Sequence, residues 1–294
     1  MNDLIKPYTI AVEQCQVDDL KRRLEFTRWP DPESVSDWSQ GVPLAYMQEL
    51  SEYWLHEYDW RIWEQRLNNW GQFITCIDNV DIQFMHIRSP HADAMPLLIT
   101  HGWPGSMTEF HKIIEPLTNP TAHGGQSEDA FHLVLPTLPG YGFSGKPALS
   151  GWGVDKIGRA WAELMARLGY DSYVAQGGDW GAMVTQSIAQ TDTTHCAGIH
   201  VTFPIVAPDP ATMDDLQDIE IRALAAMTHY DRWDSGYAKQ QSTRPQTLGY
   251  GLSDSPVGQA AWIVEKFWSW MDCGETDGHP ENILTRDELL DNIS

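Results

Sequence analysis

The sequence predicts an α/β protein with a mostly parallel central sheet, because short apolar runs alternate along the chain with segments of helical periodicity. The apolar runs have the continuity of strands that are buried on both faces of a sheet, and they lie at 96–100, 131–138, 172–176 and 197–203. Helical patterns separate them, at 106–117, at 154–168 before Gly169, and at 181–190. Before the first run, 72–77 and 81–89 flank Asp78-Asn79 and predict a β-hairpin.

The alternation is confined to the middle of the chain. Three helices are predicted before the hairpin, at 17–28 (capped by Asp18 and ended by Pro30 and Pro32), at 43–58 and at 59–70. This first segment is rich in tryptophan, which indicates packing more than a cofactor site. After Pro204 the chain shows helical and loop patterns, with no further buried strand.

Composition and charge argue against several functional classes. The chain has 294 residues and a net charge of −22, so binding to nucleic acid or to an anionic membrane surface is not expected. The 4 cysteines form no CxxC pair, which argues against a zinc site and a disulfide framework. No basic leader precedes an apolar stretch at the N-terminus, and no run approaches the roughly 18 apolar residues of a membrane span. A cytoplasmic protein is expected.

A carboxylate stands where many hydrolases present a nucleophile. Residues 177–181 read Gly-Gly-Asp-Trp-Gly and fit the pattern G-x-nucleophile-x-G, with a predicted strand before them and a predicted helix after them. A carboxylate that attacks an sp³ carbon forms an alkyl ester, which water then cleaves at the aspartyl carbonyl. Asp179 is therefore the candidate nucleophile for an epoxide or for a carbon that carries halide. The alternative is a solvated aspartate in a tight turn.

Two loops that follow predicted strands add to this interpretation. The first, HGWPGS at 101–106, directly follows the strand at 96–100. The backbone N–H groups of Trp103 and Trp180 are expected to face the ester oxygen as it becomes negative during hydrolysis. His101 is expected to be structural and to hydrogen-bond the backbone. The second loop, LPGYGFSGKP at 138–147, follows the next strand.

With these motifs in this order, the sequence resembles the epoxide hydrolases of the α/β-hydrolase superfamily, in the microsomal and juvenile-hormone branch. The resemblance implies a helical, Trp-rich N-terminal extension over 1–71, an α/β-hydrolase core over 72–203 and a partial helical cap over 204–294. It also implies that Asp179 is the nucleophile and that Tyr237, in the Gly-Tyr-x-x-x-Gln context of the cap, hydrogen-bonds the epoxide oxygen and donates a proton. Tyr250 does not match the second tyrosine of the family and is interpreted as structural.

The resemblance also indicates what is missing. Ester hydrolysis requires a general base, normally a histidine oriented by an acid, and in this superfamily both follow the nucleophile. None of the four histidines after Asp179 has the expected context. The chain therefore resembles an epoxide hydrolase cut off before its base, its acid, its second tyrosine and its last strands. We expect alkylation at Asp179 without turnover, and an unpaired sheet edge that favours aggregation. The histidines in question are His195, His200, His229 and His279.

Other functions stay open at this point. A haloalkane dehalogenase also uses Asp-Trp at the elbow, although it commonly has an asparagine where this chain has Trp103. A non-catalytic ligand-binding derivative of the fold is the alternative from another class. The expected partners are a small apolar epoxide and water, with no cofactor and no metal. The sequence indicates neither the particular epoxide nor the oligomeric state.

Overall fold

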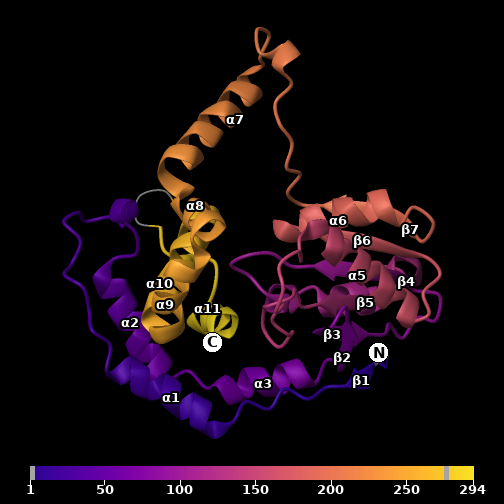
Figure 1. Cartoon of the computed structure of the whole chain (residues 1–294), viewed down its shortest axis with the longest axis horizontal. Helices are drawn as coiled ribbons and strands as arrows, with labels where there is room; N and C mark the ends of the chain where they lie inside the picture. The colour runs from indigo at the N-terminus through magenta and orange to yellow at the C-terminus, as the bar shows by residue number, and fades with distance from the viewer. Residues whose placement is uncertain (1–3, 275–277) are drawn as a thin grey trace.

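The computed structural model describes residues 4–274 and 278–294, which form a seven-stranded sheet and a separate group of helices (Figure 1). The strands follow the order β1-β2-β3-β5-β4-β6-β7. Four of them, β5, β4, β6 and β7, are parallel, while β1, β2 and β3 extend the sheet in antiparallel pairs. The predicted α/β class is confirmed. The strands are β1 (Lys6–Pro7), β2 (Gln72–Ile77), β3 (Val80–Ile87), β4 (Met95–Thr100), β5 (Phe131–Pro136), β6 (Tyr173–Gly177) and β7 (Cys196–Val201).

The predicted hairpin is present as β2 and β3. Asp78 and Asn79 form its two-residue turn with φ of +48° and +62°. Two consecutive residues with positive φ give the turn whose twist matches that of the two strands. Asparagine and aspartate tolerate this backbone conformation better than most residues, which is why the sequence pattern is informative here.

Alternate side chains of the strands enter two different cores, so both faces of the sheet are buried. On one face Phe84, Leu98 and Val134 pack with α5 (Val154–Arg167) and α6 (Trp180–Thr191). The other face is covered by the N-terminal segment, α3 (Trp60–Asn68) and the segment after β4. That last segment is not the continuous helix predicted over 106–117. It is a 3₁₀ turn η2 (Met107–Phe110) followed by the short helix α4 (Ile114–Thr118), and η2 places Glu109 in the site described below.

A third core joins helices that are far apart in the sequence. In Figure 1, α1 (Gln14–Glu25) and α2 (Leu44–His56) lie beside α10 (Pro256–Trp270) and α11 (Arg286–Ile293). Their apolar side chains form one cluster, with Leu50, Ala260 and Leu290 at its centre. The helix α1 begins and ends three residues before the predicted limits, and Asp18 lies within it instead of capping it.

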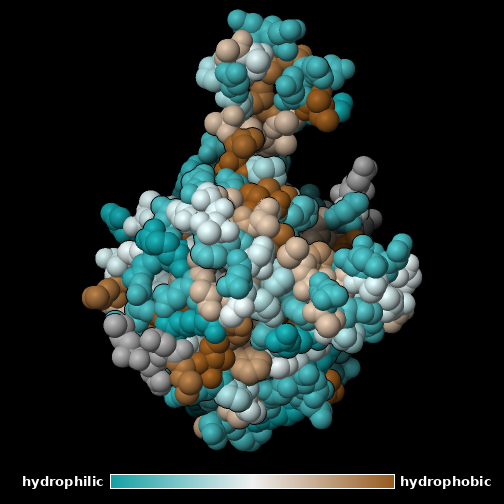
Figure 2. Space-filling model, turned by 90° about the vertical axis from the view of Figure 1, so that its right-hand side faces the viewer, coloured by the Kyte–Doolittle hydropathy of each residue, from teal (hydrophilic) through white to brown (hydrophobic). Residues whose placement is uncertain are grey.

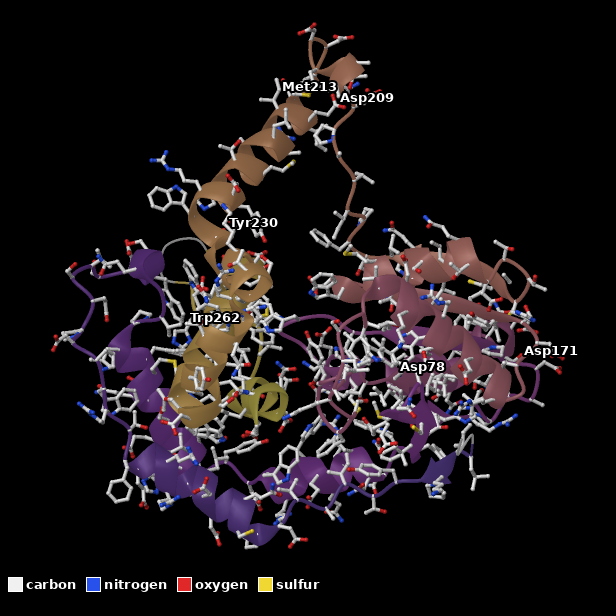
Figure 3. All side chains as sticks on the ribbon, viewed as in Figure 1. Asp78, Asp171, Asp209, Met213, Tyr230 and Trp262 are labelled. Atoms are coloured by element: carbon white, nitrogen blue, oxygen red, sulfur yellow. The ribbon has the colours of Figure 1, made fainter. Side chains whose placement is uncertain are left out.

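The part of the chain after β7 extends away from the sheet. The segment at 202–217 leads to α7 (Asp218–His229), and together they form an arm with Asp209 and Met213 at its tip and Tyr230 at its base (Figures 1 and 3). Apolar side chains are exposed on this arm among hydrophilic ones, as Figure 2 shows. The chain returns through a π-helical turn η6 (Tyr230–Asp234), α8 (Gly236–Thr243) and α9 (Pro245–Asp254).

The strand β7 differs from its prediction as a strand buried on both faces. It pairs with β6, and among the described residues it has no partner on its other side. Its side chains are half-buried or exposed, with Ile199 42% exposed. In the described part of the chain, no helix combines the length and the apolar character that crossing a membrane requires.

Candidate active site

The backbone at Asp179 is held in a conformation that residues with a side chain rarely adopt. Asp179 lies between the end of β6 and the start of α6, with φ of +49° and ψ of −125°. Such a backbone is strained and persists only where the surrounding structure enforces it. This turn places the Asp179 carboxylate at the carboxyl end of the parallel strands, beside the loop that follows β4.

The surrounding structure enforces this turn by close backbone packing. A Cβ atom on Gly177 would lie 2.2 Å from the carbonyl oxygen of Gly181, and one on Gly181 would lie 1.9 Å from that of Thr100. Both distances are far below van der Waals contact. The glycines of the elbow are therefore required so that β4, β6 and α6 can meet beneath Asp179.

The loop 101–106 holds the carboxylate from the other side. The N–H of Trp103 donates a hydrogen bond of 2.8 Å to Oδ1 of Asp179. Gly102 makes this approach possible, because a Cβ atom at that position would lie 2.4 Å from the same oxygen. Trp180 is the first residue of α6, where a backbone N–H has no partner within the helix. The carboxylate thus meets one amide directly and lies next to the N-terminus of a helix.

His101 is a buried structural residue. Its Nε2 accepts a hydrogen bond of 3.0 Å from the N–H of Leu138, and its Nδ1 lies 3.1 Å from the carbonyl oxygen of Gly102. This pairing requires a neutral ring with the proton on Nδ1. Burial lowers the pKa of His101 to about 4, although the contact with the Gly102 carbonyl opposes the shift. The histidine therefore connects the two loops that follow β4 and β5.

Asp179 faces a pocket of about 410 Å³ between the sheet and α10. Trp103 belongs to its wall, and the Tyr237 ring stacks on the Trp103 ring at 4.8 Å between centroids with an interplanar angle of 9°. The Trp270 ring meets the Tyr237 ring edge-on at 5.3 Å. Trp103 therefore contacts both residues: its backbone N–H binds Asp179, and its indole ring stacks on the Tyr237 ring. Tyr250, in contrast, is 72% exposed on α9.

The charge of Asp179 contributes to raising the pKa of two further acidic groups. Glu109, on η2, lines the same pocket, where desolvation of its carboxyl and then the charge of Asp179 raise the pKa of that carboxyl. Gly105 makes room for Glu109, since a Cβ there would lie 1.2 Å from the carboxyl oxygen Oε1. Burial, and then the charge of Asp179, raises the pKa of Tyr141 to about 12. For both groups the shift favours the protonated form.

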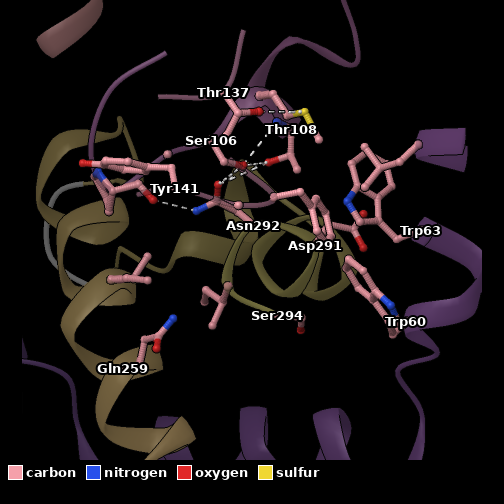
Figure 4. A pocket seen from close by; sticks show the side chains of 18 of the residues that line it. Trp60, Trp63, Ser106, Thr108, Thr137, Tyr141, Gln259, Asp291, Asn292 and Ser294 are labelled. Carbon is pink, nitrogen blue, oxygen red and sulfur yellow. Dashed lines mark hydrogen bonds between the residues drawn. The ribbon is translucent and has the colours of Figure 1, made fainter. Parts of the chain in front are cut away.

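A second pocket, of about 520 Å³, lies against the same loop (Figure 4). Asn292 on α11 closes part of it. Its Nδ2 donates to the carbonyl oxygen of Pro104 at 2.9 Å, and its Oδ1 accepts from the hydroxyl groups of Ser106 at 3.1 Å and Thr108 at 3.2 Å. These bonds fix the loop just beyond Trp103, so α11 supports the amide that binds Asp179.

The four histidines that follow Asp179 lie elsewhere. None of them is among the described residues that line the Asp179 pocket. His200 is on β7, and the His279 ring packs edge-on against the Tyr46 ring at 4.5 Å between centroids. The other two lie beside aspartates: His195 Nδ1 is 2.5 Å from Asp192 Oδ1, and His229 Nε2 is 3.8 Å from Asp234 Oδ2.

The sequence is similar to that of known proteins. A family model described as "Epoxide hydrolase N terminus" matches residues 5–110, and one described as "alpha/beta hydrolase fold" matches residues 95–239. A putative epoxide hydrolase of Stigmatella aurantiaca is 56% identical over 99% of this chain and 65% of its own length. Epoxide hydrolase 1 of Oryctolagus cuniculus is 34% identical over 99% of this chain and 69% of its own length. The chain belongs to the epoxide hydrolase family.

Solved structures agree with this membership. The juvenile hormone epoxide hydrolase of the silkworm Bombyx mori superposes with a TM-score of 0.87 at 30% identity, over 99% of this chain and 73% of the other. The Aspergillus niger epoxide hydrolase gives a TM-score of 0.87 at 32% identity, over 99% and 74%. The predicted α/β-hydrolase fold is confirmed. The chain spans about two thirds of the length of the curated epoxide hydrolases it matches.

Sequence reasoning missed several groups at this pocket. Glu109 lies in a segment that the sequence pattern predicts to be a regular helix. Tyr141 lies in a loop to which the sequence assigns no role. Lys266 and Trp270 lie on α10 and reach the pocket from a part of the chain almost 90 residues beyond Asp179. A signal did exist for Lys266, because it is a cation within the apolar stretch WIVEKFWSW.

Proposed function

We propose that this chain opens small apolar epoxides by attack of the Asp179 carboxylate on an epoxide carbon. The carbon–oxygen bond of the ester forms as the strained carbon–oxygen bond of the epoxide breaks, and Tyr237 donates its proton to the leaving oxygen. The observation that carries the proposal is the strained backbone of Asp179, whose carboxylate is held by the Trp103 amide in an apolar pocket, with Tyr237 stacked on the Trp103 ring of the pocket wall. The amides of Trp103 and Trp180 would then stabilise the oxyanion when the ester is hydrolysed.

The described residues support the first half of the reaction better than the second. Hydrolysis of the ester needs a base beside the aspartyl carbonyl, and none of the four later histidines lines the pocket. Loss of one member of a catalytic triad costs about 10⁴-fold or more in rate. We therefore propose that the 294-residue chain forms the covalent adduct and does not release diol at a useful rate.

Intact-mass spectrometry tests both statements. After incubation with an aryl epoxide, the wild-type chain should gain one equivalent of adduct, and peptide mapping should place it on Asp179. The variant Asp179→Asn should gain none, whereas Asp171→Asn, an exposed aspartate just before β6, should react like the wild type. Adduct on other carboxylates with an unmodified Asp179 would refute the nucleophile. Repeated diol formation by the purified chain would refute the single turnover, and His279→Ala would then be the first variant to examine.

A further inference from the structure

A buried lysine lies beside the proposed proton donor. Lys266 is on α10, its side chain is 5% exposed, and it lines the pocket that contains Asp179. Burying an ammonium group costs free energy unless its partners compensate for the lost water. Packing of α10 alone therefore does not explain why a lysine is found in the pocket wall.

The contacts of the ammonium group indicate that reason. Nζ lies 2.5 Å from Oε2 of Glu265 and 3.4 Å from the carbonyl oxygen of Asp234. It also lies over the Tyr237 ring, 4.8 Å from the centroid, and 5.6 Å from the centroid of the Trp270 ring. A cation within about 6 Å of an aromatic face is attracted to it, and more strongly where water is excluded.

The other groups around Tyr237 oppose its ionisation. Burial raises the pKa of Tyr237 first, followed by the hydroxyl of Tyr230 at 3.0 Å and by the negative charges of Asp179 and Glu265. A phenol that gives its proton to an epoxide oxygen becomes a phenolate in this unfavourable place. Among the described residues, Lys266 is the cation that lies over its ring.

We propose that Lys266 is a positioning residue for the proton donor: its ammonium fixes the Tyr237 ring over Trp103 and stabilises the phenolate left when the proton moves to the epoxide oxygen. The inference rests on the proposed function. In the balanced step, Asp179 supplies the electron pair of the new ester bond, the epoxide oxygen keeps the pair of the broken bond and takes the Tyr237 proton, and solvent later returns a proton to the phenolate.

A double-mutant cycle measures whether Lys266 acts through Tyr237. The rate of adduct formation on Asp179 is followed by mass spectrometry in the wild type, Lys266→Met, Tyr237→Phe and the double variant. We expect Lys266→Met to slow alkylation about tenfold, an effect between those of an exposed and a fully desolvated cation–π contact, and to have little effect when Tyr237 is already phenylalanine. Lys266→Arg should keep most of the rate, because it retains the cation.

The matched control is Lys239→Met. Lys239 is on α8 with Tyr237, but it is 66% exposed and pairs with Asp231, so its removal changes the net charge equally and should leave the rate unchanged. Equal slowing by Lys266→Met with and without the Tyr237 hydroxyl would overturn the inference. An unchanged rate of alkylation in Lys266→Met would also overturn it. If Lys266→Met does not fold, Lys266→Gln takes its place in the cycle.

A spectroscopic readout separates this inference from the proposed function. Trifluorotyrosine at position 237 has a more acidic phenol than tyrosine, and its fluorine signal reports ionisation without any epoxide. We expect Lys266→Met to raise the titration midpoint by about one pH unit, the same tenfold effect. An unchanged midpoint would overturn the role of Lys266 even if Asp179 is alkylated. Absence of any adduct in the wild type would overturn the proposed function and leave this measurement standing.

Discussion

At the scale of single residues, hydrogen bonding and burial decide which polar group in this site can react. His101 and Asp179 both lie at the carboxyl ends of parallel strands, but the two nitrogens of His101 are occupied by backbone groups. Asp179 keeps a carboxylate oxygen toward an apolar pocket. The histidine is therefore part of the scaffold of the site, and the carboxylate is the group available for chemistry.

His101 should remain neutral in the folded chain down to about pH 5. Its folded pKa of about 4 lies below the unfolded value of about 6.5, so its contribution to stability is complete above pH 6.5 and is lost as the pH falls toward 4. Between pH 7 and 5 this loss is about 2 kcal/mol of unfolding free energy. Histidine ring signals in nuclear magnetic resonance, assigned with His101→Gln, and urea unfolding at both pH values measure the effect.

His101→Gln should be less stable than the wild type at pH 7, because the N–H of Leu138 loses its acceptor. It should also lose less stability than the wild type on going to pH 5. A His101 signal that titrates near pH 6.5 would contradict the assignment of this ring as a buried neutral group.

At the scale of the elements, local sequence patterns predicted what local physics determines. Apolar runs, turn residues and glycines marked the strands, the hairpin at Asp78-Asn79 and the elbow at Asp179. The patterns failed where tertiary contacts decide: 106–117 is broken into η2 and α4, and β7 is an edge strand with exposed side chains. Likewise, Lys266 and Trp270 join the site through packing of α10, which periodicity within α10 does not reveal.

The meeting of β4 and α6 makes a further prediction about Gly181. In Gly181→Ala the new methyl group would collide with the carbonyl oxygen of Thr100 at 1.9 Å, and neither backbone can move freely. We expect a loss of about 2–4 kcal/mol in unfolding free energy and slower alkylation of Asp179, because the elbow must shift. Urea unfolding and the adduct assay measure the two effects.

Gly249→Ala is the matched control for that substitution. Gly249 lies within α9, and a Cβ atom there would meet nothing within 4 Å. Alanine should therefore stabilise the helix by about 0.5–1 kcal/mol and leave alkylation unchanged. Equal stability of both alanine variants would mean that the close approach at Gly181 is not needed in solution.

At the scale of the whole molecule, the N-terminal and C-terminal helices stabilise one another. The α1 and α2 helices share a core with α10 and α11, so residues more than 200 positions apart in the sequence pack together. The sequence predicted these helices individually but not their association, because no local pattern records which apolar faces meet. Among the described residues, β7 has no strand partner on its outer side, and the segment that follows it exposes apolar side chains.

These surfaces lead us to expect that the 294-residue chain self-associates as its concentration rises. Ile205 and Val206, in the segment that follows β7, are 52% and 78% exposed, and exposed apolar surface of this kind is a site of association. In the double variant Ile205→Lys/Val206→Lys, the dissociation constant of the self-associated form should rise severalfold, as measured by sedimentation velocity over a concentration series.

Lysine brings the net charge of −22 closer to zero, which by itself favours association. The control Phe26→Lys/Leu149→Lys changes the charge equally at residues that are 76% and 82% exposed and belong neither to β7 nor to the segment that follows it. If both double variants associate alike, the apolar side chains that follow β7 are not the contact surface.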